Sequence, residues 1–472
     1  MAKYRCIVCE YVYDEDKSSS LWMDVPQDYA CPVCGSAKKL HEKFEDAVSP
    51  SIKSTHKDID LESDKDLDGS LLRTSDDIEA YMADIHLMAE TGESITESMR
   101  TRIPTFSWDE LLIKGAQLAT LPLNKGEQVE TETIIGPGAA KPVVIQMPLF
   151  ITHMSFGALS SEAKTALAKG SAAVKTAMCS GEGGILPSSI DNAYKYIFEY
   201  VPNRYSVTED NLKRVAAIEI KFGQSAKPGM GGHLPGEKVT NEIAEIRDFP
   251  PGESITSPSK FDDIRSPEDL KKKISWLREV SEGRPIGVKF AAGNIEADLE
   301  AALYAEPDFI TIDGRAGATG AAPKYVKAST SVPTIFALHR ARKFLDENGS
   351  KNVSLIITGG IRISADIAKA LALGADAVAI GTAALMAIGC QQYRVCNTGK
   401  CPMGIATQDP TLRGNLNINK AARRLENFLN VTSNELRDFA RLTGNQSVHS
   451  LSVTDLCTVN SEISNHTSIE HV

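Results

Sequence analysis

From about residue 143 onward, short apolar runs rich in β-branched residues alternate with segments whose apolar residues recur every three or four positions. The short runs predict strands, and the longer segments predict amphipathic helices. The expected strands are Leu149–Ser155, Ala173–Cys179, Ala217–Phe222, Ile286–Ala291, Phe309–Asp313, Thr334–Ala337, Ser354–Thr358 and Ala377–Gly381, with an extended piece near Ser254–Pro258. About eight strand–helix units predict a TIM-type (β/α)8 barrel of the α/β class. An open doubly wound sheet is the alternative, which the lack of an early GxGxxG fingerprint disfavours.

The remaining chain divides by composition. Residues 1–45 form a small unit rich in cysteine and tyrosine, and residues 46–76 are rich in Ser, Asp and Lys and predict a linker. Residues 77–142 predict a helical entry region, because Ile78, Tyr81, Met82 and Ile85 recur with helical spacing. The barrel is expected over residues 143–415. Residues 416–472 predict a polar, partly helical tail, with helices at Lys420–Leu429 and Ser433–Leu442 and a frayed final dozen residues.

Charge and length narrow the function. The chain has 472 residues and a formal net charge of −11. An acidic balance disfavours nucleic acid and anionic membrane surfaces as partners. No apolar run reaches the roughly 18 residues of a membrane span, and the N-terminus lacks the pattern of a signal peptide. We therefore expect a cytoplasmic protein, acting as a homo-oligomer or within a complex.

Seven of the nine cysteines fall into two clusters. In a reducing compartment, clustered cysteines indicate metal ligands rather than disulfides. The first cluster consists of two CxxC knuckles, Cys6 with Cys9 and Cys31 with Cys34, which together offer four sulfurs in tetrahedral geometry. Such a set suits either iron or zinc.

The residues around these knuckles resemble rubredoxin. The pattern runs from Lys3-Tyr4 through Cys6, Cys9, Tyr11 and Tyr13, and ends with Cys31-Pro32 and Cys34-Gly35. The stretch between the cysteine pairs is short, as in the modules fused to rubrerythrins, and Glu10 stands where glycine is usual. The resemblance implies a single iron that passes one electron at a time, with zinc as the alternative.

The second cluster is Cys390-x5-Cys396-x4-Cys401-Pro402, directly after the last expected strand. Its spacing alone leaves an iron–sulfur cluster, a zinc loop and a chance grouping open. The whole segment from Gly389 to Asp409 resembles the three-cysteine segment of glutamate synthase. That resemblance implies a 3Fe–4S cluster on an iron–sulfur loop at residues 389–409.

A Gly-Gly pair ends one of the last two expected strands, and a Gly-Thr pair ends the other. Gly359-Gly360 and Gly381-Thr382 lie where barrels bind phosphate with backbone N–H groups. Taken singly, each pair could equally be an ordinary tight turn. Their motifs resemble those of the synthase domain of glutamate synthase, over roughly residues 100–415, and this resemblance implies FMN as the phosphate ligand. The matching cofactor-binding residues are Met154, Ser155, Gly157, Lys221, Gln224, Lys227, Asp313, Gly314, Gly359, Gly360, Gly381 and Thr382.

Lys227 lies in a loop rich in Gly and Pro, after an expected strand that is apolar apart from Glu219 and Lys221. A lysine there can stabilise negative charge on a flavin or a substrate carboxylate, or can simply be solvated. The resemblance implies that Lys227 and Arg247 bind 2-oxoglutarate. It also implies that Glu182 transfers protons or handles ammonia.

Three features depart from the large glutamate synthases. His233 replaces a glutamine at a substrate-binding position, Cys179 replaces asparagine, and residues 257–263 lack a His-rich segment. The sequence shows no glutaminase domain, no C-terminal β-helix and no NAD(P)H fingerprint. Free ammonia, or a glutaminase or reductase partner subunit, is therefore expected.

The resemblance implies an oxidoreductase of the glutamate synthase type, acting on the CH–NH2 group of donors. It would reductively aminate 2-oxoglutarate to L-glutamate, with electrons passing from an external donor protein through the rubredoxin-like iron and the 3Fe–4S cluster to FMN. Two alternatives stay open: the flavin subunit of an N-methylglutamate-synthase-like complex, and a non-catalytic electron-transfer subunit.

Overall fold

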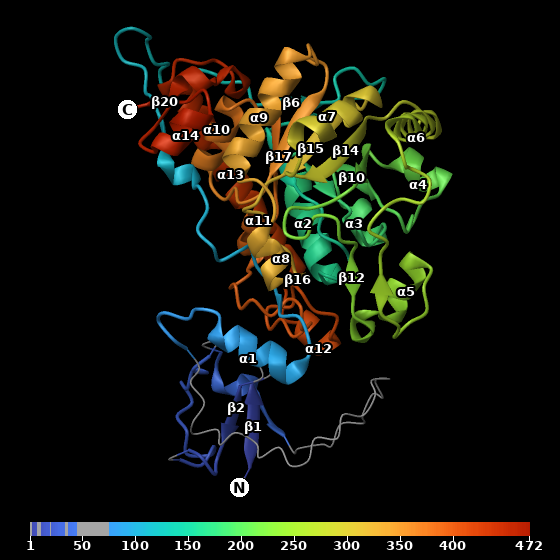
Figure 1. Ribbon diagram of the computed structural model, residues 1–472, viewed down its shortest axis with the longest axis vertical. Helices are drawn as coiled ribbons and strands as arrows, with labels where there is room; N and C mark the ends of the chain where they lie inside the picture. The colour runs from blue at the N-terminus through green and yellow to red at the C-terminus, as the bar shows by residue number, and fades with distance from the viewer. Residues whose placement is uncertain (1, 7–10, 19, 34–35, 45–74) are drawn as a thin grey trace. The chain divides into compact units, whose positions relative to one another are not determined.

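The computed structural model describes residues 2–6, 11–18, 20–33, 36–44 and 75–472 (Figure 1). The chain forms two compact units, residues 1–96 and residues 97–472. The predicted linker at 46–76 lies almost wholly outside the described residues, as do Cys9, Glu10 and Cys34.

The first unit contains a small antiparallel sheet and an aromatic cluster. Strand β1 (Lys3–Cys6) pairs with β2 (Val12–Asp14) on one side and with β3 (His41–Phe44) on the other. Trp22 stacks on Tyr4 with ring centroids 4.8 Å apart and meets the edge of Tyr13 at 4.9 Å. His41 joins this cluster, 5.0 Å from Trp22. Helix α1 (Met82–Thr91) follows, and it ends at Gly92 in the left-handed conformation.

The second unit is built on a closed barrel of eight parallel strands, which confirms the predicted fold class. The strands close in chain order, and their bounds are β8 (Leu149–Ile151), β9 (Ala177–Cys179), β10 (Lys195–Tyr200), β11 (Ala217–Lys221), β14 (Ile286–Ala291), β15 (Phe309–Asp313), β17 (Ser354–Thr358) and β18 (Ala377–Ile380). Helices between the strands surround them (Figure 1), as the alternating pattern predicts.

One strand of the barrel was missed, and one predicted strand was wrong. Strand β10 (Lys195–Tyr200) was missed, although five of its six residues are buried. Thr334–Ala337 was predicted as a strand but forms the first turn of helix α9 (Thr334–Glu347). Pro333 precedes this helix, and Ile335, Leu338 and Leu345 are buried on one face. Helical spacing, which places those residues together, outweighs the local β-branched content.

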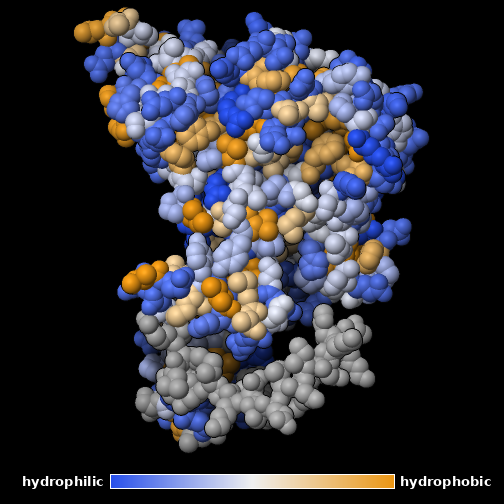
Figure 2. Space-filling model, viewed as in Figure 1, coloured by the Kyte–Doolittle hydropathy of each residue, from blue (hydrophilic) through white to orange (hydrophobic). Residues whose placement is uncertain are grey.

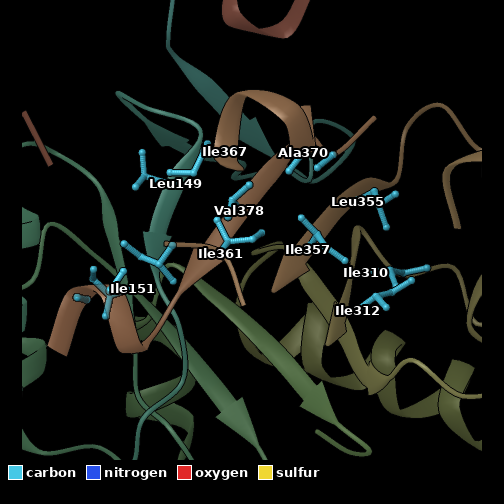
Figure 3. Packing of buried hydrophobic residues seen from close by; sticks show 14 of the residues in the cluster. Leu149, Ile151, Ile310, Ile312, Leu355, Ile357, Ile361, Ile367, Ala370 and Val378 are labelled. Atoms are coloured by element: carbon cyan, nitrogen blue, oxygen red, sulfur yellow. The ribbon is translucent and has the colours of Figure 1, made fainter. Parts of the chain in front are cut away.

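Alternation along each strand divides the barrel into two cores. Leu149, Ile151, Ile310, Ile312, Leu355, Ile357 and Val378 belong to the cluster shared with the surrounding helices (Figure 3). The intervening residues, such as Phe150, Phe309 and Ile356, belong to a separate inner cluster. That cluster also includes Ile135 and Val143 from the hairpin of β6 (Thr133–Ile135) and β7 (Val143–Ile145). Because successive strand residues point to opposite faces, every barrel strand except β14 contributes to both cores.

Surrounding helices complete the unit. They include α2 (Ser161–Ala173), α6 (Pro267–Val280), α7 (Ile295–Tyr304), α10 (Ser364–Ala372), α11 (Thr382–Ile388) and the long α13 (Ile418–Leu442). Helix α13 contacts α2, where Gly170 allows close approach: a Cβ on Gly170 would lie 2.8 Å from Cβ of Leu425. The two helices predicted in this region are therefore one continuous helix of 25 residues.

The C-terminal residues are ordered rather than frayed. Strand β19 (Leu456–Thr458) pairs with β5 (Leu111–Ile113) and with β20 (Glu470–His471). Helix α14 (Ser461–His466) lies between β19 and β20. Within the helical entry region predicted at residues 77–142, the structure forms helix α1 and one 3-10 turn at Trp108–Glu110, before β5.

Polar residues dominate the face of the barrel unit seen in Figure 2, and apolar residues occupy scattered patches. Among the described residues, no helix combines the length and apolar character that crossing a bilayer requires.

Candidate active site

A cavity of about 650 Å³ lies in the barrel unit. Many of its lining residues follow directly after barrel strands, at the end where this fold places active sites. The cavity brings together most of the predicted site residues: Met154, Ser155, Glu182, Lys221, Gln224, Lys227, His233, Arg247, Gly360, Gly381, Thr382, Cys390, Cys396 and Cys401.

Four predicted residues do not line the cavity: Gly157, Asp313, Gly314 and Gly359. Asp313 accepts hydrogen bonds from the backbone N–H and the hydroxyl of Ser225, at 3.1 and 2.8 Å. Gly157 lies beside Arg247, since a Cβ on it would be 2.9 Å from Nη2. These positions support residues of the cavity wall, and their direct contact with a cofactor stays a prediction.

An ion pair lies in the cavity wall. Lys221 Nζ is 2.7 Å from Glu182 Oε2, and the N–H of Gly232 donates to Glu182 Oε1 at 3.1 Å. Burial alone would raise the pKa of Glu182, but the charge and hydrogen bond of Lys221 outweigh it and hold the pKa at about 2. Conversely, burial would lower the pKa of Lys221, but the charges of Glu182 and Glu199 raise it. Near neutral pH, Glu182 is a carboxylate and Lys221 is an ammonium.

Glu182→Gln is therefore expected to weaken the pH dependence of stability in acid. A carboxyl whose pKa is depressed on folding stabilises the folded state above its ordinary pKa of 4.5, and the contribution is lost as pH falls towards about 2. The difference in free energy of unfolding between wild type and variant should be on the order of 3 kcal/mol larger at pH 6 than at pH 2. Urea unfolding of the cofactor-free protein at several pH values measures it. A constant difference across that range would contradict the assignment.

Beneath this pair, a histidine joins two buried glutamates that sequence reasoning did not assign to the site. The N–H of Gly181 donates to Nδ1 of His153 at 3.1 Å, so Nδ1 carries no proton. His153 Nε2 lies 2.9 Å from Glu219 Oε2. Burial would raise the pKa of Glu219, but the adjacent His153 lowers it. Glu219 and Lys221 alternate with apolar residues on β11, which places both toward the barrel interior.

Two cations suited to a dicarboxylate lie in the same cavity. Lys227 Nζ donates to the carbonyl of Gly231 at 3.1 Å, and burial together with the charge of Lys221 lowers its pKa. Arg247, at the end of α5 (Asn241–Arg247), is 8% exposed and donates through Nη2 to the carbonyl of Phe156 at 2.7 Å. Its Nε is buried and has no hydrogen-bond partner within the described parts of the chain. Both cations retain donors for a ligand.

The glycine-rich turn after β17 has no room for a side chain at Gly360. Gly360 has a φ of +84°, and a Cβ there would lie 2.3 Å from Cβ of Ala316. Only glycine avoids both the backbone strain and the clash. Arg362 and Arg100 also line the cavity, and the sequence assigned neither of them a role. Burial and the neighbouring charge of Arg100 lower the pKa of Arg362.

A buried lysine ties strand ends together below the cavity. Lys164 on α2 donates to the carbonyls of Met154, Cys179 and Ser180 at 2.9, 3.0 and 2.7 Å. Burial lowers the pKa of Lys164 to about 7. These bonds position Met154 at the end of β8 and the loop that carries Glu182.

Lys164→Met is expected to destabilise the barrel unit by about 3 kcal/mol, because each buried carbonyl left without a donor costs about 1–3 kcal/mol. The change would be measured as the urea midpoint of unfolding at constant slope. Lys169→Met, at a partly exposed lysine of the same helix, is the control and should stay within about 0.5 kcal/mol of wild type. Equal stability of the two variants would contradict the structural role of Lys164.

Cys390, Cys396 and Cys401 all line the cavity. Burial, followed by the charges of Cys401 and Cys390, raises the pKa of Cys396 to about 12. Gln392 donates to the Cys390 sulfur from its side chain at 3.2 Å. Cys457, on β19, does not line the cavity.

In the first unit, Cys6 and Cys31 are the two cysteines of the N-terminal knuckles within the described residues. Their sulfurs and a ring nitrogen of His41 lie within 4.8 Å of one another. The Ser36 hydroxyl is 3.0 Å from the Cys6 sulfur. Whether iron or zinc occupies this site stays a prediction.

Comparison with known proteins decides the family. A model of the conserved region in glutamate synthase matches residues 86–446, and a rubredoxin model matches residues 3–41. The chain belongs to the glutamate synthase family. It is therefore an oxidoreductase of the glutamate synthase type, acting on the CH–NH2 group of donors, with an N-terminal rubredoxin domain.

Relatives in this family span most of the chain. The archaeal-type glutamate synthase [NADPH] of Thermotoga maritima is 38% identical over 395 residues, which are 79% of this chain and 78% of that protein. The glutamate synthase large subunit-like protein of Rhizobium meliloti is 37% identical over 401 residues, 81% of this chain and 91% of that protein. Among solved structures, a flavocytochrome b2 variant aligns at 16% identity with a TM-score of 0.49, covering 74% of this chain and 76% of that one.

Proposed function

We propose that this enzyme reductively aminates 2-oxoglutarate with ammonia to L-glutamate, using FMN and a 3Fe–4S cluster. An external donor protein would supply the electrons through the rubredoxin centre. One observation carries the proposal: a single cavity gathers a half-buried lysine, a buried arginine, a glycine turn without room for side chains, and three cysteines of one loop.

The cavity suits a flavin mononucleotide. Its volume falls in the range of ligand pockets. The backbone at Gly360 and Gly381 can approach a phosphate closely, and the guanidinium groups of Arg100 and Arg362 favour an anion at the same wall. Met154, Ser155, Gln224 and Lys221 would surround the ring system. When bound, the flavin supplies hydride transfer, and the iron centres supply single electrons.

The three cysteines suit a 3Fe–4S cluster, which takes three thiolates. After burial, the charges of neighbouring cysteines raise the pKa of Cys390 and Cys396. Bound iron would offset the repulsion between the deprotonated thiolates, because its positive charge lies between them. The donors from Gln392 to the Cys390 sulfur match the hydrogen bonds that tune such clusters.

Different residues of the cavity suit the binding of substrate and its chemistry. Lys227 and Arg247 can each bind one carboxylate of 2-oxoglutarate. Because Glu182 is a carboxylate near neutral pH, it is suited to hold ammonium or a cationic imine rather than to donate a proton. Lys221 stays protonated beside it and can stabilise negative charge at the reaction site. The exposed His233, on β12 (His233–Leu234), lies where it can contact substrate.

Glutamate formation tests the proposal directly. The purified protein, with flavin and iron contents determined, would receive an excess of dithionite-reduced viologen, 2-oxoglutarate and ammonium. We expect L-glutamate, dependent on all three. Loaded protein that forms no glutamate would contradict the proposal, whereas product from methylamine but not from ammonium would favour the N-methylglutamate alternative.

A further inference from the structure

One buried lysine lies in the segment that carries two proposed substrate-binding residues, and it contacts the cysteine loop. We call residues 233–247 the substrate segment, since it carries His233 and Arg247. Between them, Lys238 ends a 3-10 turn, Gly236–Lys238, and its Nζ donates to the carbonyl of Cys396 at 2.6 Å. Lys238 is 8% exposed.

The position of Lys238 is fixed on both sides. Its N–H donates to the carbonyl of Pro235 at 2.9 Å, and the N–H of Gly236 donates to Ser254 Oγ at 2.9 Å. Its aliphatic chain lies against Gly399, where a Cβ would be 2.8 Å from Cε. Gly399 lies between Cys396 and Cys401 and has a φ of +73°. The lysine therefore occupies one defined place beside the cysteine loop.

Lys238 forms no salt bridge with a carboxylate within the part of the chain that the structure describes. Burial lowers its pKa, whereas the nearby sulfurs of Cys396 and Cys401, followed by the charge of Glu237, raise it. Two of the three cysteines of the cluster site are thus the groups that act most strongly on the Lys238 ammonium.

We propose that the Lys238 ammonium raises the reduction potential of the 3Fe–4S cluster held by Cys390, Cys396 and Cys401. The inference rests on the proposed function, which places the cluster there. Reduction adds one electron to the cluster and breaks no bond, so the buried site gains one negative charge. A fixed cation in a poorly screened environment stabilises the reduced state more than the oxidised state. Lys238 is a positioning residue in this role, because it acts on the cluster without touching substrate.

The test is an EPR-monitored redox titration of the full-length protein, with dithionite as reductant. Lys238→Met removes the charge and the donor, whereas Lys238→Gln removes the charge and keeps a donor. Both are expected to shift the one-electron reduction equilibrium of the cluster at least tenfold toward the oxidised form, about 59 mV for one electron. Lys238→Arg should retain most of the wild-type potential, and Lys351→Met, at an exposed lysine, should leave it unchanged.

The outcomes separate this inference from the proposed function. Wild-type protein without a 3Fe–4S signal would overturn both. A cluster signal with the same potential in wild type, Lys238→Met and Lys238→Gln would overturn the inference alone. A shift in Lys238→Met but not in Lys238→Gln would assign the effect to the hydrogen bond, and would also overturn a role for the charge. Iron and sulfide contents show that each variant carries its cluster.

Discussion

Replacing Cys396 with serine is expected to abolish the EPR signal of an oxidised 3Fe–4S cluster. Cys396 is the central cysteine of the loop, and its sulfur is close to those of both Cys390 and Cys401. A serine oxygen is a harder ligand than thiolate and suits iron–sulfur chemistry poorly. We expect sulfide to fall to background and iron to fall to the amount held by the rubredoxin domain.

The fold should survive this change, because serine is close to cysteine in size and keeps the backbone carbonyl that accepts from Lys238. The matched control is Cys457→Ser, at a buried cysteine on β19 that does not line the cavity. It should keep the full signal. A normal signal in Cys396→Ser would show that the cluster is held elsewhere.

Replacing Lys227 with methionine is expected to lower kcat/KM for 2-oxoglutarate by about 10- to 150-fold. A lost charge-assisted hydrogen bond costs about 1.5–3 kcal/mol, and 1.36 kcal/mol corresponds to a factor of ten. Methionine keeps the volume of the partly buried chain, which limits structural change. The measurement is the initial rate of glutamate formation against 2-oxoglutarate concentration, with flavin content determined in parallel.

Two comparisons make this result specific to substrate binding. Lys227→Arg should recover part of the activity because it keeps the charge. Lys351→Met should match wild type, since that lysine is exposed. Full activity of Lys227→Met would leave Arg247 as the main carboxylate ligand, and would argue against the role proposed for Lys227.

Local patterns predicted the barrel because apolar residues recur at strand or helix spacing along most of its elements. Pairs such as Ile310 with Ile312 and Leu355 with Ile357 lie in one helix-facing cluster, so strand periodicity and burial agree. Errors arose where a local pattern and its surroundings conflict. Lys195–Tyr200 contains a lysine and a glutamate, which obscured a strand whose Glu199 is 2% exposed inside the barrel.

The candidate site was predictable where residues adjacent in sequence carry the chemistry. Gly359-Gly360 and the three-cysteine loop are local, because backbone conformation and ligand spacing are set within a few residues. Lys238 and His153 gave no such signal. Their significance depends on partners far along the chain, Cys396 and Glu219, whose proximity the folded barrel alone creates.

By itself, the sequence determined the parallel barrel, the rubredoxin-like pattern and the identities of the chemical groups, because periodicity and short motifs are properties of neighbouring residues. Tertiary structure alone decided the charges and hydrogen-bond partners of the groups in the site. Burial and long-range pairing make Glu182 a carboxylate beside Lys221, direct the N–H of Gly181 to Nδ1 of His153, and place the Lys238 ammonium against the cysteine loop. Electrostatic energy depends on distance and solvent exposure, and both quantities exist only once the chain has folded.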